Sequence, residues 1–184
     1  EQKQHLEITR DIAERFNNIY GDVFTIPEAY IGKKGAKIMS LQEPGKKMSK
    51  SDTNANATIL LLDDTDTIIR KFKRAVTDSE SEVRYAEEKP GISNLMDIYS
   101  AVTGKTYEEI EKEFAGKGYG DFKLAVGETV ADHLKPLQER YEQLMKDKAY
   151  IESMIKQNDE KAAYYANKTL RKVQKKVGLT ERIR

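Results

Sequence analysis

Apolar residues recur every three or four positions over the first part of the chain, which is the spacing of one face of an α-helix. The pattern covers residues 2–20 and is followed by Gly21, a residue type that commonly ends helices. The expected apolar stripe consists of Ile8, Ile12, Phe16 and Ile19 or Tyr20. We therefore predict a helix over residues 2–20 with one buried face.

Two short stretches with a different composition follow this helix. They read "DVFTIPEAYI" (22–31) and "GAKIMSL" (35–41), are rich in β-branched and aromatic residues, and are separated by Pro27, Gly32 and Gly35. Such stretches favour short extended segments over helices. We expect one of them to end a sheet.

Helical spacing returns after "ILLLDD" (59–64) and continues to the end of the chain. The predicted helices cover residues 65–76 behind an Asp64 cap, 91–102, a short segment opened by a Thr106/Glu109 capping box and stopped by Gly116, 122–145 with a bend at Pro136, and 159–177 ended by Gly178. Four of these helices have an expected inward face. It consists of Ile68, Ile69, Phe72 and Val76 in 65–76, and of Ile92, Leu95, Tyr99 and Val102 in 91–102. In 122–145 it consists of Val126, Val130, Leu134, Leu137, Tyr141 and Leu144, and in 159–177 of Ala162, Ala166, Leu170 and Val173. The remainder of the chain is predicted to be all-α.

Composition limits the classes of function. The chain has 184 residues, 38% of them apolar, which suffices for one sizeable domain or two small ones. The net charge is only +1, so an anionic partner must meet a local basic patch. The chain has no Cys and two His, which excludes disulfides and thiolate metal sites, and we expect no metal centre and a cytoplasmic location. No run approaches the ~18 apolar residues that span a bilayer, so we expect no membrane partner.

The sequence begins "EQKQHLEITR", without Met and already within a helical pattern. We expect residue 1 to be a cut inside a larger protein.

The stretch "PGKKMSKSD" (44–52) carries the candidate chemistry. It lacks the glycine spacing of a P-loop. Lys47 and Lys50 are three residues apart, with Ser49 and Ser51 beside them, so one turn can offer two ammonium groups and two hydroxyls to a triphosphate. The alternative is a solvated lysine loop.

Residues 47–51, "KMSKS", are identical to the signature loop of class I aminoacyl-tRNA synthetases, a match expected by chance at roughly one in a million positions. Five further stretches resemble, in order, the C-terminal half of bacterial tryptophanyl-tRNA synthetases: "QKQHLEITRDIAERFN", "KIMSLQEPGKKMSKSD", "AVTDSESEVRY", "KPGISNLMDIYS" and "GKGYGDFK". The resemblance covers nearly the whole chain.

The resemblance implies a mainly α fold. Residues 1–63 would form the C-terminal part of a Rossmann-type α/β nucleotide-binding domain, and residues 64–184 an all-α anticodon-binding domain. Enzymes of this family join tryptophan to ATP, with Mg²⁺ on the phosphates, and transfer the tryptophanyl group to tRNA(Trp). The full-length protein would be a homodimer.

The resemblance also implies roles for single residues. The loop over ATP would consist of Lys47, Met48, Ser49, Lys50 and Ser51, and of these Lys47, Lys50 and Ser51 would be catalytic. Ile38 would lie at the adenine of ATP and Glu1 at its ribose. Gln2 would lie near the amino acid. Glu1 departs from the family's usual Asp, and an exposed helix-start carboxylate is the alternative. For Ile38 the alternative is a buried strand residue, and we expect His5 and His133 to be structural. The family's "HIGH"-type element is absent from the sequence.

The end of the chain is locally basic. From Lys156 to Arg184 there are nine Lys or Arg against three acidic residues, with Tyr164 and Tyr165 among them. Basic helices bind phosphates, and tyrosines stack on unpaired bases, so this segment is a candidate tRNA surface. The alternative for each residue is a solvated helix. The alternative for the whole chain is a catalytically silent RNA-binding or interaction module.

Overall fold

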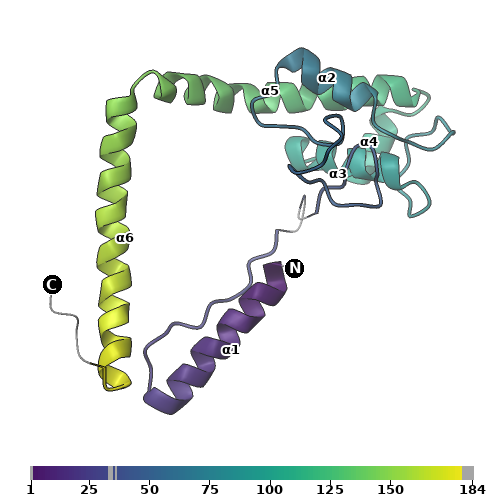
Figure 1. Ribbon diagram of the computed structural model, residues 1–184. Coiled ribbons are helices and arrows are strands. Elements are labelled where there is room, and N and C mark those ends of the chain that lie inside the picture. The colour runs from purple at the N-terminus through teal and green to yellow at the C-terminus, as the bar shows by residue number, and fades with distance from the viewer. Residues whose placement is uncertain (1, 33–34, 36, 180–184) are drawn as a thin grey trace. The chain divides into compact units, whose positions relative to one another are not determined.

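The computed structural model describes residues 2–32, 35 and 37–179 and contains six α-helices in that part of the chain (Figure 1). They are α1 (Gln2–Tyr20), α2 (Thr65–Lys73), α3 (Pro90–Thr103), α4 (Tyr107–Glu113), α5 (Tyr119–Met145) and α6 (Lys148–Lys176). The mainly α fold is thus confirmed.

The expected sheet end is not formed by the described residues. Segments 22–31 and 37–41 are non-helical, as predicted, but no strand is present there, and one isolated antiparallel bridge pairs Met39 with Lys47. A strand needs a neighbouring strand to receive its main-chain hydrogen bonds, and these segments have none beside them.

The chain divides into two compact units, one made of Glu1–Ile31 and Leu144–Arg184 and the other of Gly32–Gln143. The functional boundary between residues 63 and 64 stays a prediction. In the described part of the chain, no helix is both long and apolar enough to cross a bilayer.

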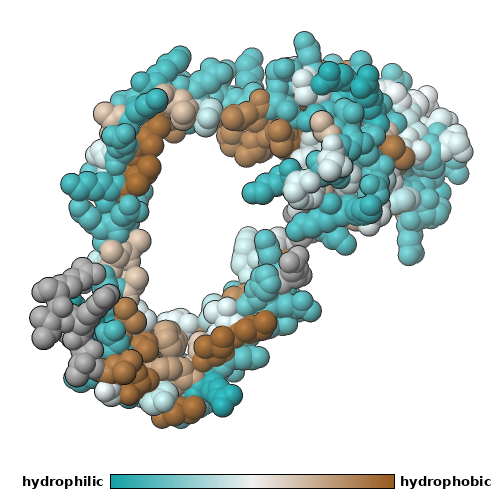
Figure 2. All heavy atoms as spheres, viewed as in Figure 1, coloured by the Kyte–Doolittle hydropathy of each residue, from teal (hydrophilic) through white to brown (hydrophobic). Residues whose placement is uncertain are grey.

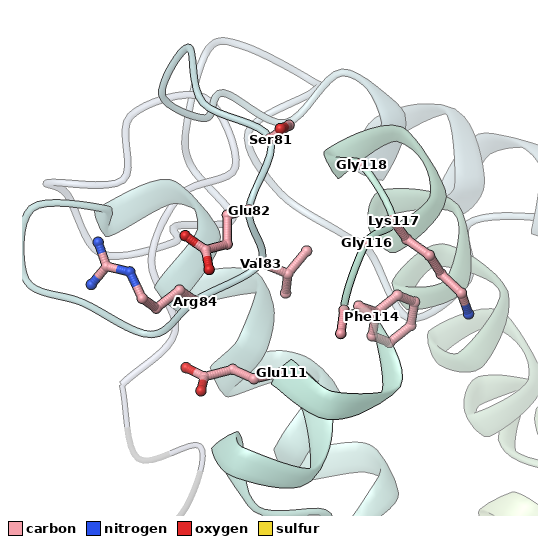
Figure 3. A pocket seen from close by; sticks show the side chains of 10 residues that line it. Ser81, Glu82, Val83, Arg84, Glu111, Phe114, Gly116, Lys117 and Gly118 are labelled. Atoms are coloured by element: carbon pink, nitrogen blue, oxygen red, sulfur yellow. The ribbon is translucent and has the colours of Figure 1, made fainter.

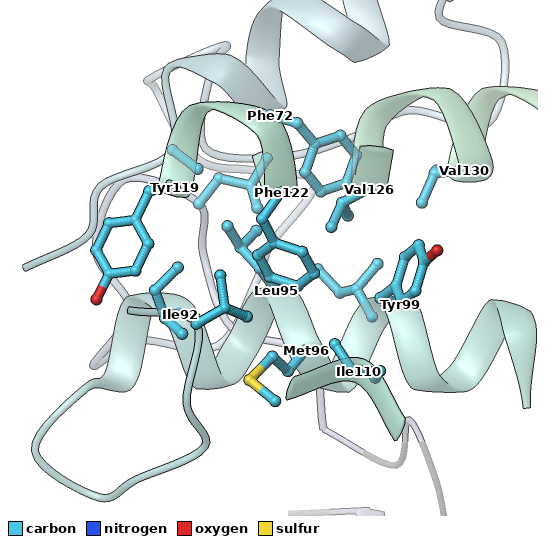
Figure 4. Close-up of a cluster of buried hydrophobic side chains, with 14 of the residues drawn as sticks. Phe72, Ile92, Leu95, Met96, Tyr99, Ile110, Tyr119, Phe122, Val126 and Val130 are labelled. Atoms are coloured by element: carbon cyan, nitrogen blue, oxygen red, sulfur yellow. The ribbon is translucent and has the colours of Figure 1, made fainter. Parts of the chain in front are cut away.

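The second unit, residues 32–143, has one hydrophobic core (Figure 4). Its largest buried apolar side chains are Phe72 and Ile68 of α2, Ile92, Leu95 and Met96 of α3, Ile110 of α4, and Phe122 and Val126 of α5, with Leu41 from the preceding segment. Three rings, those of Tyr99, Phe114 and Phe122, pack edge to face with centroids 4.8 to 5.9 Å apart. Helical spacing therefore identified the core faces of α2, α3 and the first half of α5.

The predicted helix boundaries in this unit are largely confirmed. The Asp64 side chain accepts a hydrogen bond from the Thr67 N–H, and Thr106 and Glu109 form the predicted capping box. Three inward assignments fail. Val76 is 47% exposed because α2 already ends at Lys73, and Leu137 and Tyr141 are exposed in the second half of α5.

In the other unit the predicted helices form, but their apolar faces are not buried. Ile8, Ile12 and Ile19 are 57%, 64% and 62% exposed, and Ala13 is the buried residue of α1. Brown side chains at the surface of this unit show the same exposure in Figure 2. The loop after α1 contributes Phe24, which packs edge to face on Phe16 of the helix, and offers too little apolar surface to cover the stripe.

Helix α6 departs further from prediction. It begins at Lys148 behind an Asp147 cap, eleven positions before the predicted start at residue 159. It has no buried residue, so the predicted inward set is wrong: Ala162, Ala166 and Leu170 are exposed and Val173 is half-buried. The rest of the described part of its unit leaves most of that face exposed.

Candidate functional site

The KMSKS residues, 47–51, lie in a loop that main-chain hydrogen bonds close at its base. The Met48 N–H donates to the Ile38 carbonyl (2.9 Å), and the Leu41 N–H donates to the Ala57 carbonyl (3.0 Å). Leu41 and Ala57 are each 1% exposed, so the loop starts and ends on the hydrophobic core.

The polar side chains of the loop face solvent. Lys47, Ser49, Lys50 and Ser51 are exposed, and no ion-pair partner of either lysine occurs among the described residues. The Ser49 and Ser51 hydroxyl oxygens are 2.9 Å apart and share a hydrogen bond. The Ser51 N–H also donates to the Ser49 hydroxyl (3.3 Å), so the two serines form one small turn. The loop therefore presents two ammonium groups and a paired set of hydroxyls to solvent.

The preceding lysine differs from these two. Lys46 is paired with the Glu43 carboxylate, and the hydrogen bond to Glu43, with its charge, raises the pKa of Lys46 above its ordinary value. Its amine is therefore engaged within the loop, and Lys47 and Lys50 remain the cations open to an anion.

The other predicted site residues are placed less fully. Ile38 and Met48 are half-buried and pack against the core, and the Ile38 carbonyl holds the loop through Met48. Gln2 is exposed at the start of α1, and Glu1 lies outside the described residues. His5 and His133 are both exposed. Ile38 is only half-buried and lies in no strand, so its alternative reading as a buried strand residue is not confirmed, and its adenine contact stays a prediction.

Sequence reasoning missed an asparagine that holds the loop base. Asn94 of α3 is 3% exposed; its side-chain oxygen accepts from the Met39 N–H (2.8 Å), and its amide nitrogen donates to the Met39 carbonyl (2.9 Å). The signal was present in the sequence, because Asn94 lies beside Leu95 on an apolar helix, and a buried amide requires polar partners.

A buried lysine was missed as well. Lys71 of α2 is 5% exposed and forms an ion pair with Asp63 (2.6 Å). Its ammonium also donates to the Thr58 carbonyl (2.8 Å). The Thr58 hydroxyl in turn donates to the Ser49 carbonyl (2.7 Å), which connects α2 to the middle of the KMSKS loop. In the sequence Lys71 has the spacing of an ordinary surface lysine, and nothing there indicates its burial.

A second buried ionic group lies away from the loop. Lys89 is 1% exposed, donates to the Tyr119 hydroxyl (2.9 Å), and is paired with Glu80 and Asp78. Its hydrogen bonds to Glu80 and Tyr119 raise the pKa of Lys89, so it stays charged. The Tyr119 hydroxyl donates to Asp78 (2.7 Å). This network fixes the 78–89 segment on α5.

A cavity of about 380 Å³ lies where segment 81–84 meets segment 111–118 (Figure 3). Val83 and Phe114 form its apolar wall, and Glu82 and Glu111 lie at its edge beside Arg84. Its two acidic side chains are matched by two basic ones, Arg84 and Lys117. The cavity is therefore not specialised for an anion, unlike the loop.

Helix α6 carries eight Lys or Arg and three acidic residues, and its side chains are exposed or half-buried. Tyr164 and Tyr165 are 63% and 58% exposed and contact each other edge to face, with centroids 5.4 Å apart. The predicted basic surface with exposed rings is thus present on one helix.

Known sequences resemble this chain closely. It is 54% identical to the tryptophan–tRNA ligase of Clostridium tetani over 178 residues, which is 97% of this chain and 53% of that protein. It is 53% identical to the tryptophan–tRNA ligase of Listeria monocytogenes over 180 residues, 97% of this chain and 54% of that protein. The chain spans about half the length of the curated relatives it matches.

Solved structures give the same result. A tryptophanyl-tRNA synthetase from Mycoplasma pneumoniae matches with a TM-score of 0.86 and 31% identity, over 97% of this chain and 54% of that one. The enzyme from Campylobacter jejuni in complex with ADP and tryptophan matches with a TM-score of 0.65 and 29% identity, over 96% of this chain and 54% of that one. The sequence profile of the tRNA synthetases class I (W and Y) matches residues 1–135. With its KMSKS loop and this match over most of its length, the chain belongs to the class I tRNA synthetases for tryptophan and tyrosine.

Proposed function

We propose that this chain supplies the ATP loop and the tRNA-binding helices of a tryptophan–tRNA ligase. The whole reaction would activate tryptophan with ATP, release pyrophosphate, and transfer the tryptophanyl group to tRNA(Trp). The observation that carries the proposal is the KMSKS loop, anchored on the core with Lys47 and Lys50 exposed. The relatives named tryptophan–tRNA ligase and the neighbour with ADP and tryptophan support the choice of substrates.

The loop would act through charge. Negative charge builds on the leaving pyrophosphate, and ammonium groups held near it lower the barrier, each by on the order of 3 kcal/mol in a site that excludes water. Lys47 and Lys50 would contact the phosphates, and Ser49 and Ser51 would donate hydroxyl hydrogen bonds. Mg²⁺ would arrive on the ATP phosphates as part of the substrate.

The remaining assignments belong to the same proposal. Residues 1–63 would be the end of the nucleotide-binding domain, with Ile38 at the adenine, Glu1 at the ribose and Gln2 near tryptophan. Residues 64–184 would bind the anticodon, with α6 and its eight basic residues at the phosphates. The protein would act as a cytoplasmic homodimer.

The test uses a full-length form of the protein, as long as the relatives and containing these 184 residues. The measurement is tryptophan-dependent ATP/pyrophosphate exchange. Lys50→Ala should lower exchange by ~100-fold or more, because a transition-state contact is lost from an exposed loop, and the melting temperature should change little. Lys46→Ala is the matched control: its amine is held by Glu43, so exchange should stay near that of the parent.

The 184-residue chain alone, which lacks the "HIGH"-type element, should show no exchange at micromolar concentration. Exchange that is unaffected by Lys50→Ala would remove Lys50 from the mechanism.

A second candidate function is a catalytically silent RNA-binding module, favoured by the basic α6, which has no buried residue. Such a module would bind tRNA equally well with and without Lys50, and its full-length form would give no exchange at all.

A further inference from the structure

The KMSKS loop has little side-chain packing of its own, so its geometry depends on the groups that hold its main chain. Four of its five residues are exposed, and Met48 is the half-buried one. Among the described residues, two side chains from outside segment 39–51 bond to the main chain of that segment. They are Asn94, which bonds to Met39, and Thr58, which bonds to Ser49.

Asn94 holds the segment from which the loop departs. Its amide makes two hydrogen bonds with the same residue, to the N–H and to the carbonyl of Met39, at 2.8 and 2.9 Å. Two bonds to one residue fix its orientation as well as its position. The carbonyl of the preceding residue, Ile38, accepts a hydrogen bond from the Met48 N–H. By fixing Met39, Asn94 therefore also positions the start of the KMSKS loop.

Thr58 holds the middle of the loop. Its hydroxyl donates to the Ser49 carbonyl at 2.7 Å, and its own carbonyl accepts from Lys71 at 2.8 Å. Lys71 is 5% exposed and paired with Asp63, so it provides a rigid support. The loop is therefore tied to α3 through Asn94 and to α2 through Thr58 and Lys71.

We propose that Asn94 and Thr58 are positioning residues of the KMSKS loop, which keep Lys47 and Lys50 in the arrangement that a triphosphate requires. The role in ATP chemistry rests on the proposed function, whereas the effect on loop order does not. Neither side chain needs to touch ATP, because both act through the main chain of the loop. A loop held in advance loses less conformational freedom when its ligand binds.

Trypsin tests the Thr58 contact in the 184-residue chain itself, because Lys47 and Lys50 are exposed cleavage sites on the loop. Thr58→Val keeps the shape of the side chain and removes the hydroxyl. Cleavage after Lys50 should become about fivefold faster, the effect of one lost hydrogen bond on the open population. Thr58→Ser restores the hydroxyl and should return the rate to that of the parent.

Cleavage after Lys112, an exposed lysine of α4, is the internal reference and should not change. If Thr58→Val leaves cleavage after Lys50 unchanged, or accelerates cleavage after Lys50 and Lys112 alike, the proposal is wrong.

Amide hydrogen exchange tests the Asn94 contact. Asn94→Ala should accelerate exchange of the Met48 N–H by about tenfold, since the segment that accepts its hydrogen bond loses two anchors. Ser93→Ala is a matched control on the same helix, because Ser93 is also buried and bonds to the main chain of Ala86 instead of the loop base. Equal effects of the two substitutions on Met48 would overturn the role of Asn94.

Exchange kinetics of the full-length form separate the two proposals. Thr58→Val should lower kcat/KM for ATP by about fivefold and leave KM for tryptophan unchanged, and Thr58→Ser should restore the parent value. If Lys50→Ala has no effect on exchange while Thr58→Val still loosens the loop, the proposed function fails and the positioning role stands.

Discussion

Helices α3 and α6 show how differently two helices of one chain are stabilised. Helix α3 has 14 residues and buries nine of them, whereas α6 has 29 residues and buries none. Most of the stability of α3 comes from tertiary packing, while α6 depends on its length, its own hydrogen bonds and its Asp147 cap. The difference separates a scaffold that holds the KMSKS loop from a surface that is open to a partner.

The largest effect on stability is expected from a core aromatic residue. Phe122 of α5 is fully buried and packs on Phe114 and Tyr99, so Phe122→Ala should lower the free energy of unfolding by about 3–5 kcal/mol. Leu170→Ala in α6 is the control and should cost less than about 1 kcal/mol, because Leu170 is already 50% exposed. Urea unfolding followed by circular dichroism measures both. Equal losses would remove the distinction between the two helices.

A smaller effect is expected at the ionic network beside the core. Burial opposes ionisation of Asp78, but hydrogen bonds from Tyr119 and the Glu80 amide, with the charge of Lys89, keep its pKa below the ordinary value of 3.8. The stability this group contributes is present above pH 3.8 and is lost as the pH falls through the lower, folded-state pKa.

Asp78→Asn should therefore lower stability at pH 7 by about 1.5–3 kcal/mol and reduce the loss on acidification. Urea midpoints from pH 7 to pH 2 measure this. Asp132→Asn, at an exposed position of α5, should leave the profile unchanged, and a profile shared by both variants would contradict the assignment.

The smallest effect on stability is expected in α6. Replacing Lys172, Lys175 and Lys176 by Ala should change the free energy of unfolding by less than about 0.5 kcal/mol, because all three are exposed. The same change should flatten the salt dependence of tRNA binding by up to about three units of slope if each lysine meets a phosphate. Alanine at Lys3, Lys112 and Lys135 is the control set, and an equal slope in both sets would argue against α6 as the tRNA surface.

The starts and ends of the helices were predictable from the sequence where the helical spacing of apolar residues was bounded by a capping residue. Asp64 and Thr106 fixed the starts of α2 and α4, and positive φ angles at Gly21, Gly116 and Gly178 accompany the predicted ends. Burial was predictable only where a partner surface exists among the described residues. The spacing of apolar residues predicts which residues share a helix face. It does not predict whether another element covers that face, and Ile12 and Leu170 stay exposed.

The candidate site was predictable in part. The letters of residues 47–51 identified the loop, because the proposed phosphate contacts are made by those side chains. The groups that hold the loop were not identified. Asn94 and Thr58 act on main-chain atoms of Met39 and Ser49, and main-chain contacts leave no complementary residue type in the sequence.

The hydrogen bonds between Met39 and Asn94 join residues 55 positions apart, and this separation sets an order of folding. The hydrogen bonds within helices α2 and α3 join residues close in the sequence, but the base of the KMSKS loop closes only after α3 is in place to receive Met39. Contacts of long sequence separation form late because the loop between them must first lose its conformational freedom. The loop that carries Lys47 and Lys50 is therefore expected to be among the last parts of the chain to reach its native form during refolding. A newly made chain would form its helices before the KMSKS loop becomes ordered.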